Sequence, residues 1–193
     1  MRTFSILLAS VASLGLVGCI GMGSEDKKKL AGACEGQAVE GAGSYQGGAE
    51  GFMPFEQKEP GETFGYSVDG VHFKLHRASS LAETHTVFCL EPVEEVEQGQ
   101  CAFETVEGIG VAGIPVVDLS RSKGPTFPRV GMKRKGRLVD PSTGETVAEH
   151  LVEVPAPKCE GTFGEPTESA FRALEPTGIS FADWTLGQLG VEG

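Results

Sequence analysis

Alternation of apolar and polar residues over 63–76 is the feature that most restricts the fold of this chain. Apolar residues occupy every second position on each side of Asp69-Gly70: Phe64, Tyr66, Val68, Val71, Phe73 and Leu75. Such alternation is typical of a strand with one buried face. A two-residue Asp-Gly connection favours a type I′ turn, and pairing across it places all six side chains on the same face. The sequence therefore predicts a β-hairpin here.

Three further segments have the composition of strands. Residues 84–90 and 101–106 combine β-branched and aromatic side chains, and residues 111–119 form an apolar stretch. Pro115 interrupts the third segment, which predicts an edge or irregular strand because proline cannot donate to a central ladder.

A second hairpin is predicted from residues 129–139 and 145–154. The connecting sequence Asp140-Pro141-Ser142-Thr143-Gly144 suits a turn, since Asp can start it, Pro sets φ and Gly tolerates the left-handed region. The stretch from Thr143 to Glu149, with Pro157-x-Cys159 after it, resembles a segment of exported bacterial β domains that have no assigned activity. That resemblance implies a β domain and no particular function.

The pattern changes towards the end of the chain. Residues 167–174 predict a short helix that Pro176 ends, and residues 180–183 predict the cap of a last helix in which Trp184 packs inward. We therefore expect a mainly β protein, an antiparallel sandwich or barrel-like domain with short C-terminal helices, stapled by disulfides.

The first nineteen residues have the organisation of an export signal. Arg2 is the only charged residue before Glu25, and an apolar run of 14 residues (4–17) follows it. A positive residue, an apolar run and small residues in this order are typical of a secretory signal. The run ends in Leu16-Val17-Gly18-Cys19, which resembles the lipobox of bacterial lipoproteins. The resemblance implies cleavage before Cys19, a diacylglyceryl group on its thiol and an acyl chain on the new amino terminus.

The alternative for this segment is an uncleaved membrane anchor, because residues 3–24 are uncharged and nearly long enough to span a bilayer. Its glycine and serine content, and the absence of a basic cluster directly after the run, favour the lipoprotein. The expected organisation is a signal peptide over 1–18, a lipidated flexible tether over 19–33 and one exported β-rich domain over 34–193.

Lipidation implies a place in the cell envelope. The partner it implies is the membrane, held through the lipid on Cys19. In enteric lipoproteins an Asp after the lipidated cysteine retains the protein in the inner membrane. Ile20 occupies that position here, so the same resemblance favours the outer membrane, on its periplasmic or surface face, in a host that has one.

Assigning Cys19 to lipid leaves Cys34, Cys89, Cys101 and Cys159. An even set in an exported protein predicts two disulfides, for which three connectivities exist. Residues 91–99 look like a loop between two strands, so we expect Cys89–Cys101 and, by elimination, Cys34–Cys159. No spacing among the cysteines suits a zinc site or a redox Cys-x-x-Cys motif.

The charge balance restricts the partners. The chain has 16 Lys+Arg against 27 Asp+Glu, a formal net charge of −11, which argues against a nucleic-acid partner. One basic cluster stands out, and on a strand its members share a face. We name it the basic row, and it is the candidate contact surface: Arg129, Lys133, Lys135 and Arg137. It could meet anionic lipid or an acidic envelope protein, although neutralisation by glutamates on neighbouring strands is favoured.

No catalytic motif is present. Residues 108–113 match G-x-G-x-x-G, but the β-prone sequence and Pro115 after them exclude the helix that a dinucleotide site requires. The sequence thus predicts no catalytic residue, no metal site and no cofactor. We expect a lipid-anchored, non-catalytic binding or structural module. The alternatives are an envelope hydrolase that uses a carboxylate pair, and a binder of small apolar ligands inside a barrel.

Overall fold

The computed structural model describes residues 22–67, 75–107, 120–159 and 167–191. As the sequence predicted, the protein is mainly β. Its strands are β1 (Phe52–Glu56), β2 (Gly65–Tyr66), β3 (Thr86–Leu90), β4 (Glu94–Glu107), β5 (Ser120–Val139) and β6 (Thr146–Val154). Its helices are α1 (Ser24–Ala31), α2 (Ala182–Leu189) and three short 3₁₀ helices, Gly32–Glu35, Glu168–Phe171 and Gly178–Phe181.

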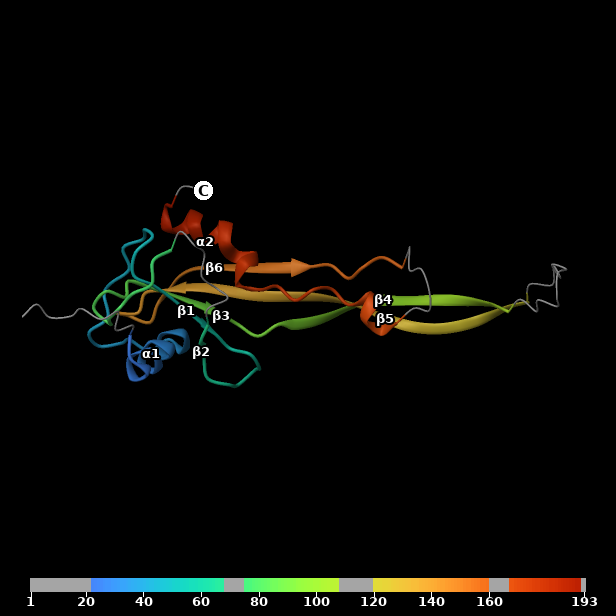
Figure 1. Cartoon of the computed structure of the whole chain (residues 1–193), viewed down its shortest axis with the longest axis horizontal. Coiled ribbons are helices and arrows are strands. Elements are labelled where there is room, and N and C mark those ends of the chain that lie inside the picture. Colours follow the sequence, from blue (N-terminus) through green and yellow to red (C-terminus); the bar gives the residue numbers. More distant parts are fainter. Residues whose placement is uncertain (1–21, 68–74, 108–119, 160–166, 192–193) are drawn as a thin grey trace, which may run out of the picture.

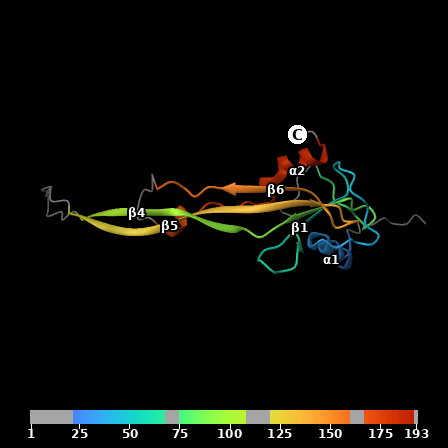
Figure 2. The ribbon, with the colours of Figure 1, turned by 180° about the vertical axis from the view of Figure 1, so that it is seen from behind.

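The described strands form one open six-stranded sheet, with the order β2-β1-β3-β5-β4 and with β6 also paired to β5. Strands β1 and β3 are parallel and the other pairs are antiparallel. The sequence predicted an antiparallel sandwich or barrel, and this is wrong. The sheet does not close, because β4 and β5 pair with each other beyond the ends of the other strands and leave the sheet as a two-stranded ribbon (Figures 1 and 2).

The ribbon of β4 and β5 makes the molecule elongated (Figure 1). Strand β5 has 20 residues, which corresponds to roughly 65 Å at the usual rise of a strand. Its C-terminal part runs through the compact end of the molecule, where β3 and β6 flank it. Its N-terminal part pairs with β4 in the twisted ribbon, where Val130 also bridges to Arg172 (Figure 1).

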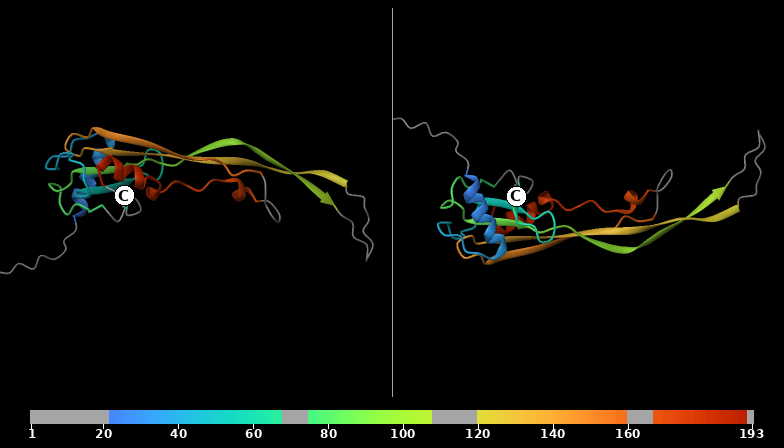
Figure 3. Two further views of the ribbon diagram at one scale, coloured as in Figure 1. Left: turned by 90° about the horizontal axis from the view of Figure 1, so that it is seen from above. Right: turned by 90° about the horizontal axis from the view of Figure 1, so that it is seen from below.

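Helical layers cover both faces of the sheet at the compact end (Figure 3). On one face, α1 and the 3₁₀ helix after it pack on Met53, Phe55, Val87, Cys89 and Val139. On the other face, α2 and the 3₁₀ helix before it pack on Phe52, Phe88, Leu90 and Leu138. Neighbouring residues of β1 and β3 thus belong to opposite cores, and all five residues of β3 are buried. We call these two sides the α1 face and the α2 face.

The flexible tether predicted over 19–33 is wrong from residue 22 onward. Met22 is buried, α1 begins at Ser24, and Leu30 and Ala31 are buried against the sheet. Acidic residues in the first turn and lysines in the last turn of α1 complement the helix dipole. The helix has only eight residues and two buried positions, so it leaves no periodic apolar pattern in the sequence.

Both disulfides differ from the predicted pairing. Cys34 bonds to Cys89 and Cys101 bonds to Cys159, with Cα–Cα distances of 5.6 and 5.5 Å. The partners of Cys89 and Cys101 on β5 are Arg137 and Phe127, ten residues apart (137 − 127), or about 34 Å. That separation excludes the predicted Cys89–Cys101 bond, which needs Cα atoms within about 7 Å. Because Cys34 lies beside Cys89 and Cys159 lies beside Cys101, the same separation excludes the predicted Cys34–Cys159 bond.

The strand predictions were correct where burial in the core imposes a pattern of apolar residues on the sequence. Strand β3 and the β5–β6 hairpin are confirmed, and Gly144 has φ 75° in the hairpin turn. The loop expected over 91–99 is wrong, because β4 begins at Glu94. The turn at Asp69-Gly70 and the strand over 111–119 lie outside the described residues. The predicted pairing of Phe64 with Leu75 on one face is wrong, because Phe64 belongs to the core on the α1 face and Leu75 to the core on the α2 face, and Gly65–Tyr66 pairs with β1.

The C-terminal prediction is correct in outline. Residues 168–171 form one 3₁₀ turn and not an α-helix. Thr177 and Ser180 form a capping box on the following 3₁₀ helix, which leads directly into α2. Trp184 is half-buried and stacks on His150 of β6, with ring centroids 5.4 Å apart.

Candidate functional site

The structure places the basic row on β5. Three of its members lie at alternate positions on the α1 face, and each has an acidic partner. The Lys133 ammonium lies 2.9 Å from Glu94 on β4, and the Lys135 ammonium lies 3.6 Å from Glu149 on β6. The Arg137 guanidinium lies 2.9 Å from Glu91 and donates to the carbonyl of Cys34. These are the ion pairs that the neutralisation alternative predicts.

Arg129, the fourth member, has a structural role. Its guanidinium donates to the carbonyls of Pro157 at 2.8 Å and Ala156 at 3.2 Å, which lie just beyond the end of β6. The amide of Ala156 in turn donates to the side chain of Gln98 on β4 at 2.9 Å. Arg129 therefore fixes this segment against the ribbon, and the basic row is not a continuous bare cationic patch.

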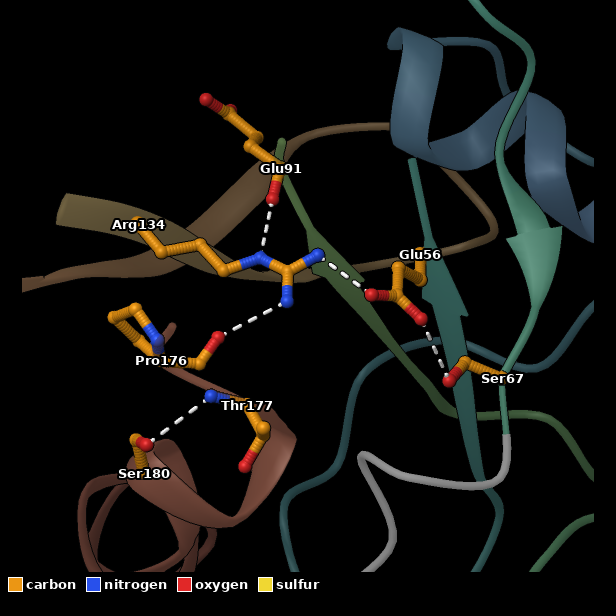
Figure 4. A network of polar contacts seen from close by, with 7 residues as sticks. All are labelled: Glu56, Ser67, Glu91, Arg134, Pro176, Thr177 and Ser180. Carbon is orange, nitrogen blue, oxygen red and sulfur yellow. Dashed lines mark hydrogen bonds and ion pairs between the residues drawn. The ribbon is translucent and has the colours of Figure 1, made fainter. Parts of the chain in front are cut away.

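Arg134 is the functional candidate that sequence reasoning missed. It lies on β5 between Lys133 and Lys135 but faces the opposite side of the sheet, and it is only 6% exposed. Its guanidinium donates to the carbonyls of Glu91 at 2.6 Å and Pro176 at 3.0 Å, and to Glu56 Oε1 at 2.6 Å (Figure 4). The alternation of β5 contained the signal, since Arg134 shares a face with the buried Met132 and Leu138.

Glu56 extends this contact into a network. Its second oxygen accepts from the Ser67 hydroxyl at 3.1 Å, beside β2. The next residue after Pro176 is Thr177, whose amide donates to the Ser180 hydroxyl at 3.2 Å (Figure 4). The network, which we call the Arg134 network, thus joins β1, β5, the β3–β4 connection and the C-terminal segment.

Two open cavities flank Glu56. One has a volume of about 420 Å³ and the other about 370 Å³. The larger is lined by Glu56, Lys58, Val93, Glu95, Arg134 and Glu175. The oxygens of Glu56 are already bound by Arg134 and Ser67, and Glu95 forms an ion pair with Arg172. The cavity is thus lined by both acidic and basic side chains, and the carboxylate of Glu56 is part of a structural ion pair with Arg134.

In the described part of the chain, two carboxyl groups have a pKa that is shifted from its ordinary value, and both lie in turns. Hydrogen bonds from the hydroxyl and amide of Ser79 lower the pKa of Glu83. Burial alone would raise the pKa of Asp140, but hydrogen bonds from Ser142 and from the amides of Tyr45 and Thr143 outweigh it and lower the pKa. A lowered pKa favours the ionised form, which suits a turn and not a general acid.

Two histidines of the described ranges contact other parts of the fold. His85 Nδ1 lies 3.1 Å from the Ser44 carbonyl, and His150 stacks on Trp184. No group of three or more His, Cys, Asp or Glu residues in the described part of the chain could hold a metal ion. The G-x-G-x-x-G string at 108–113 and His72 lie outside it.

The chain matches no protein-family model, no curated protein and no solved structure. Within the residues the structure describes, no helix is long and apolar enough to cross a membrane.

Proposed function

We propose that this chain is a lipid-anchored lipoprotein of the cell envelope that acts as a non-catalytic binding or structural module. The Leu16-Val17-Gly18-Cys19 motif and the apolar run before it support lipidation of Cys19. Two or more acyl chains on one residue give stable attachment to a bilayer. Ile20 after the cysteine supports the outer membrane, where the host has one. The partners are then the membrane and an envelope protein.

The burial of Met22 is the structural observation that supports a short connection between the lipid anchor and the folded domain. Met22 is 6% exposed and belongs to the core on the α1 face. It follows Cys19 by three residues, which span at most about 11 Å. A lipid on Cys19 would therefore hold the compact end close to the bilayer, without a long tether. The ribbon leaves the compact end and offers a long surface for contacts (Figure 2).

The arrangement of the acids supports a binding or structural role over hydrolysis. A hydrolase of the alternative kind needs two carboxylates that face each other across a cleft. Glu56 and Glu95, which line the larger cavity, instead pair with Arg134 and Arg172. The other alternative, a ligand inside a barrel, has no support either, because the sheet is open.

Mass spectrometry of the full chain extracted from its bacterial membrane tests the anchor. The expected N-terminal peptide begins at Cys19 and carries the mass of a diacylglyceryl group and an acyl chain. The Cys19→Ala variant is the matched control, and it should lose both the lipid and the cleavage. A membrane-bound wild-type protein that retains an intact peptide across residues 16–20 would overturn the proposal in favour of an uncleaved anchor.

A further inference from the structure

Strand β6 is an exposed edge of the sheet. It pairs with β5 on one side, and no strand in the described ranges pairs with its other side. Both views in Figure 3 place β6 at the border of the sheet, with α2 over one face of the sheet and α1 over the other. In an antiparallel edge strand, every second residue directs its N–H and C=O away from the sheet. Alternate residues of the nine-residue strand β6 thus present an unpaired row of main-chain groups.

The edge lacks two of the devices that usually protect one, although it has acidic side chains and a register shift between Thr146 and Ala148. Strand β6 contains no proline and no lysine, and its pairing with β5 is unbroken from Ala148 to Val154. Val147 and Leu151 are 43% and 49% exposed, and they are two of the four large apolar side chains exposed in the described residues. Leu151 lies on the α1 face of β6, opposite Lys135, whereas Val147 lies at the register shift between Thr146 and Ala148. The strand therefore offers apolar side chains that the fold does not use.

Acidic residues alternate with these apolar ones. Glu149, Leu151 and Glu153 share the α1 face, because side chains two apart lie on one face of a regularly paired strand. Glu149 is 62% exposed and makes a 3.6 Å contact to Lys135. Within the described ranges, Glu153 has no ion-pair partner. Along the regular part of the edge, the row is therefore acidic, apolar, acidic.

The chain itself contains one strand that fits this row. On the inner side of β6, Arg137 of β5 lies opposite Glu149, Lys135 lies opposite Leu151 and Lys133 lies opposite Glu153. A second neighbour on the outer side would meet the same side chains of β6 at the same spacing. Charge complementarity thus selects an extended segment with basic residues at every second position.

We propose that the outer edge of β6 binds such a segment of a partner protein by strand addition. Main-chain hydrogen bonds to the edge supply affinity, and the alternating side chains of β6 select the sequence. Glu149 and Glu153 take the basic residues of the segment, while Leu151 contacts the aliphatic parts of its side chains. This inference does not rest on the lipid anchor.

A peptide with the sequence of residues 131–139 (GMKRKGRLV) is the probe. Fluorescence anisotropy measures its binding to the full chain, purified with its disulfides intact, and hydrogen exchange locates the site. We expect saturable binding, with slower exchange of the β6 amides in the complex. A control peptide with glutamate in place of its two lysines and second arginine should not bind. Absence of saturable binding, or unchanged exchange in β6, would overturn the proposal.

Variants separate a specific edge from the attraction of any basic peptide to an acidic protein. Glu149→Gln with Glu153→Gln should weaken binding about fivefold to tenfold, since two exposed ion pairs are lost. The matched control, Glu35→Gln with Glu40→Gln, removes the same charge from exposed positions before β1 and should leave binding unchanged. Equal weakening by both pairs of substitutions would overturn the proposal.

Leu151→Lys is a second variant, which places a positive charge in the middle of the edge strand β6. It should reduce binding at least as strongly as loss of the two acids, because lysine on an edge strand opposes a basic neighbour. Sedimentation of the full chain without peptide completes the test. A dimer that Leu151→Lys dissociates would show that a second copy of this chain occupies the edge, and would overturn the proposal of a different partner.

Discussion

Arg134 shows how one buried charge can connect several segments. Its guanidinium is 6% exposed and binds one carboxylate and two carbonyls. Removing one partner of a buried ion pair leaves the other charge desolvated and unpaired. Arg134→Met should therefore lower the free energy of unfolding by about 3–5 kcal/mol, measured by urea denaturation.

The neighbouring residue provides the control for this prediction. Lys135→Met also removes a cation from β5, but Lys135 is 40% exposed and its ion pair with Glu149 is in contact with water. It should cost less than about 1 kcal/mol. A double-mutant cycle with Glu56→Gln should show coupling between Glu56 and Arg134. Equal effects of the two methionine variants would contradict a structural role for the Arg134 network.

Asp140 makes the β5–β6 turn sensitive to pH. Its Oδ1 accepts from the amide of Ser142 at 2.8 Å and from its hydroxyl at 2.7 Å. Its pKa in the folded protein is lower than the ordinary value of 3.8. A lowered folded pKa means that the carboxylate stabilises the fold above the unfolded pKa, and that this contribution is lost as the pH falls through the folded pKa.

Asp140→Asn retains an acceptor oxygen and removes the charge. It should cost roughly 1 kcal/mol at pH 7, and the difference from the wild type should shrink below about pH 4. Urea denaturation at pH 7 and pH 3 measures both effects. Glu59→Gln, at an exposed loop position, is the control for loss of one negative charge and should cost less than about 0.5 kcal/mol at pH 7. A difference that grows as the pH falls would contradict the assignment.

At the scale of elements, the sequence predicted what burial dictates. Strand β3 and the β5–β6 hairpin have apolar patterns or turn residues that only one structure satisfies. The start of β4 was missed because Glu94, Glu95 and Glu97 lie in an exposed part of the sheet, where no core imposes alternation. The candidate site was only partly predictable. The basic row follows from the period of a strand, whereas the partner of Arg134 is 78 residues away along the chain.

The two disulfides differ in access to solvent. Their sequence separations of 55 and 58 residues imply similar loop entropies, roughly 4 kcal/mol each in the chain-entropy model. Cys34 and Cys89 are both buried, whereas Cys159 is exposed. Mild reduction should therefore open Cys101–Cys159 first. Timed alkylation and mass spectrometry measure the order, and earlier release of the Cys34 thiol would contradict it.

Phe171 attaches the C-terminal segment to the ribbon. Its ring is fully buried and lies 5.3 Å from the ring of Phe103 and 5.7 Å from that of Phe127, between centroids. Phe171→Ala should cost about 3–5 kcal/mol in urea denaturation, as core phenylalanine truncations do. Leu174→Ala is the control, because Leu174 is 85% exposed and should cost less than about 0.5 kcal/mol. Similar costs would show that the segment is not held through Phe171.

At the scale of the whole molecule, the compact end and the ribbon are stabilised by different interactions. The layers over both faces of the sheet bury the apolar side chains of the compact end. The ribbon instead depends on the Cys101–Cys159 bond and on the aromatic cluster around Phe171. An elongated shape of this kind could not be predicted from the sequence, because strand length beyond the core follows from pairing between β4 and β5 and not from apolar pattern.

The buried position of Met22 gives a prediction for the anchored protein. Lipid on Cys19 should hold a label at Lys28 of α1 close to the bilayer, because the chain between Cys19 and Met22 spans at most about 11 Å. Energy transfer from this label to an acceptor lipid in vesicles should therefore be efficient. Inserting a 20-residue Gly/Ser linker after Ile20 allows an end-to-end distance of about 25 Å, so the transfer should fall while lipidation is retained. Transfer that the linker leaves unchanged would mean that the compact end contacts the membrane through its own surface and not through Cys19.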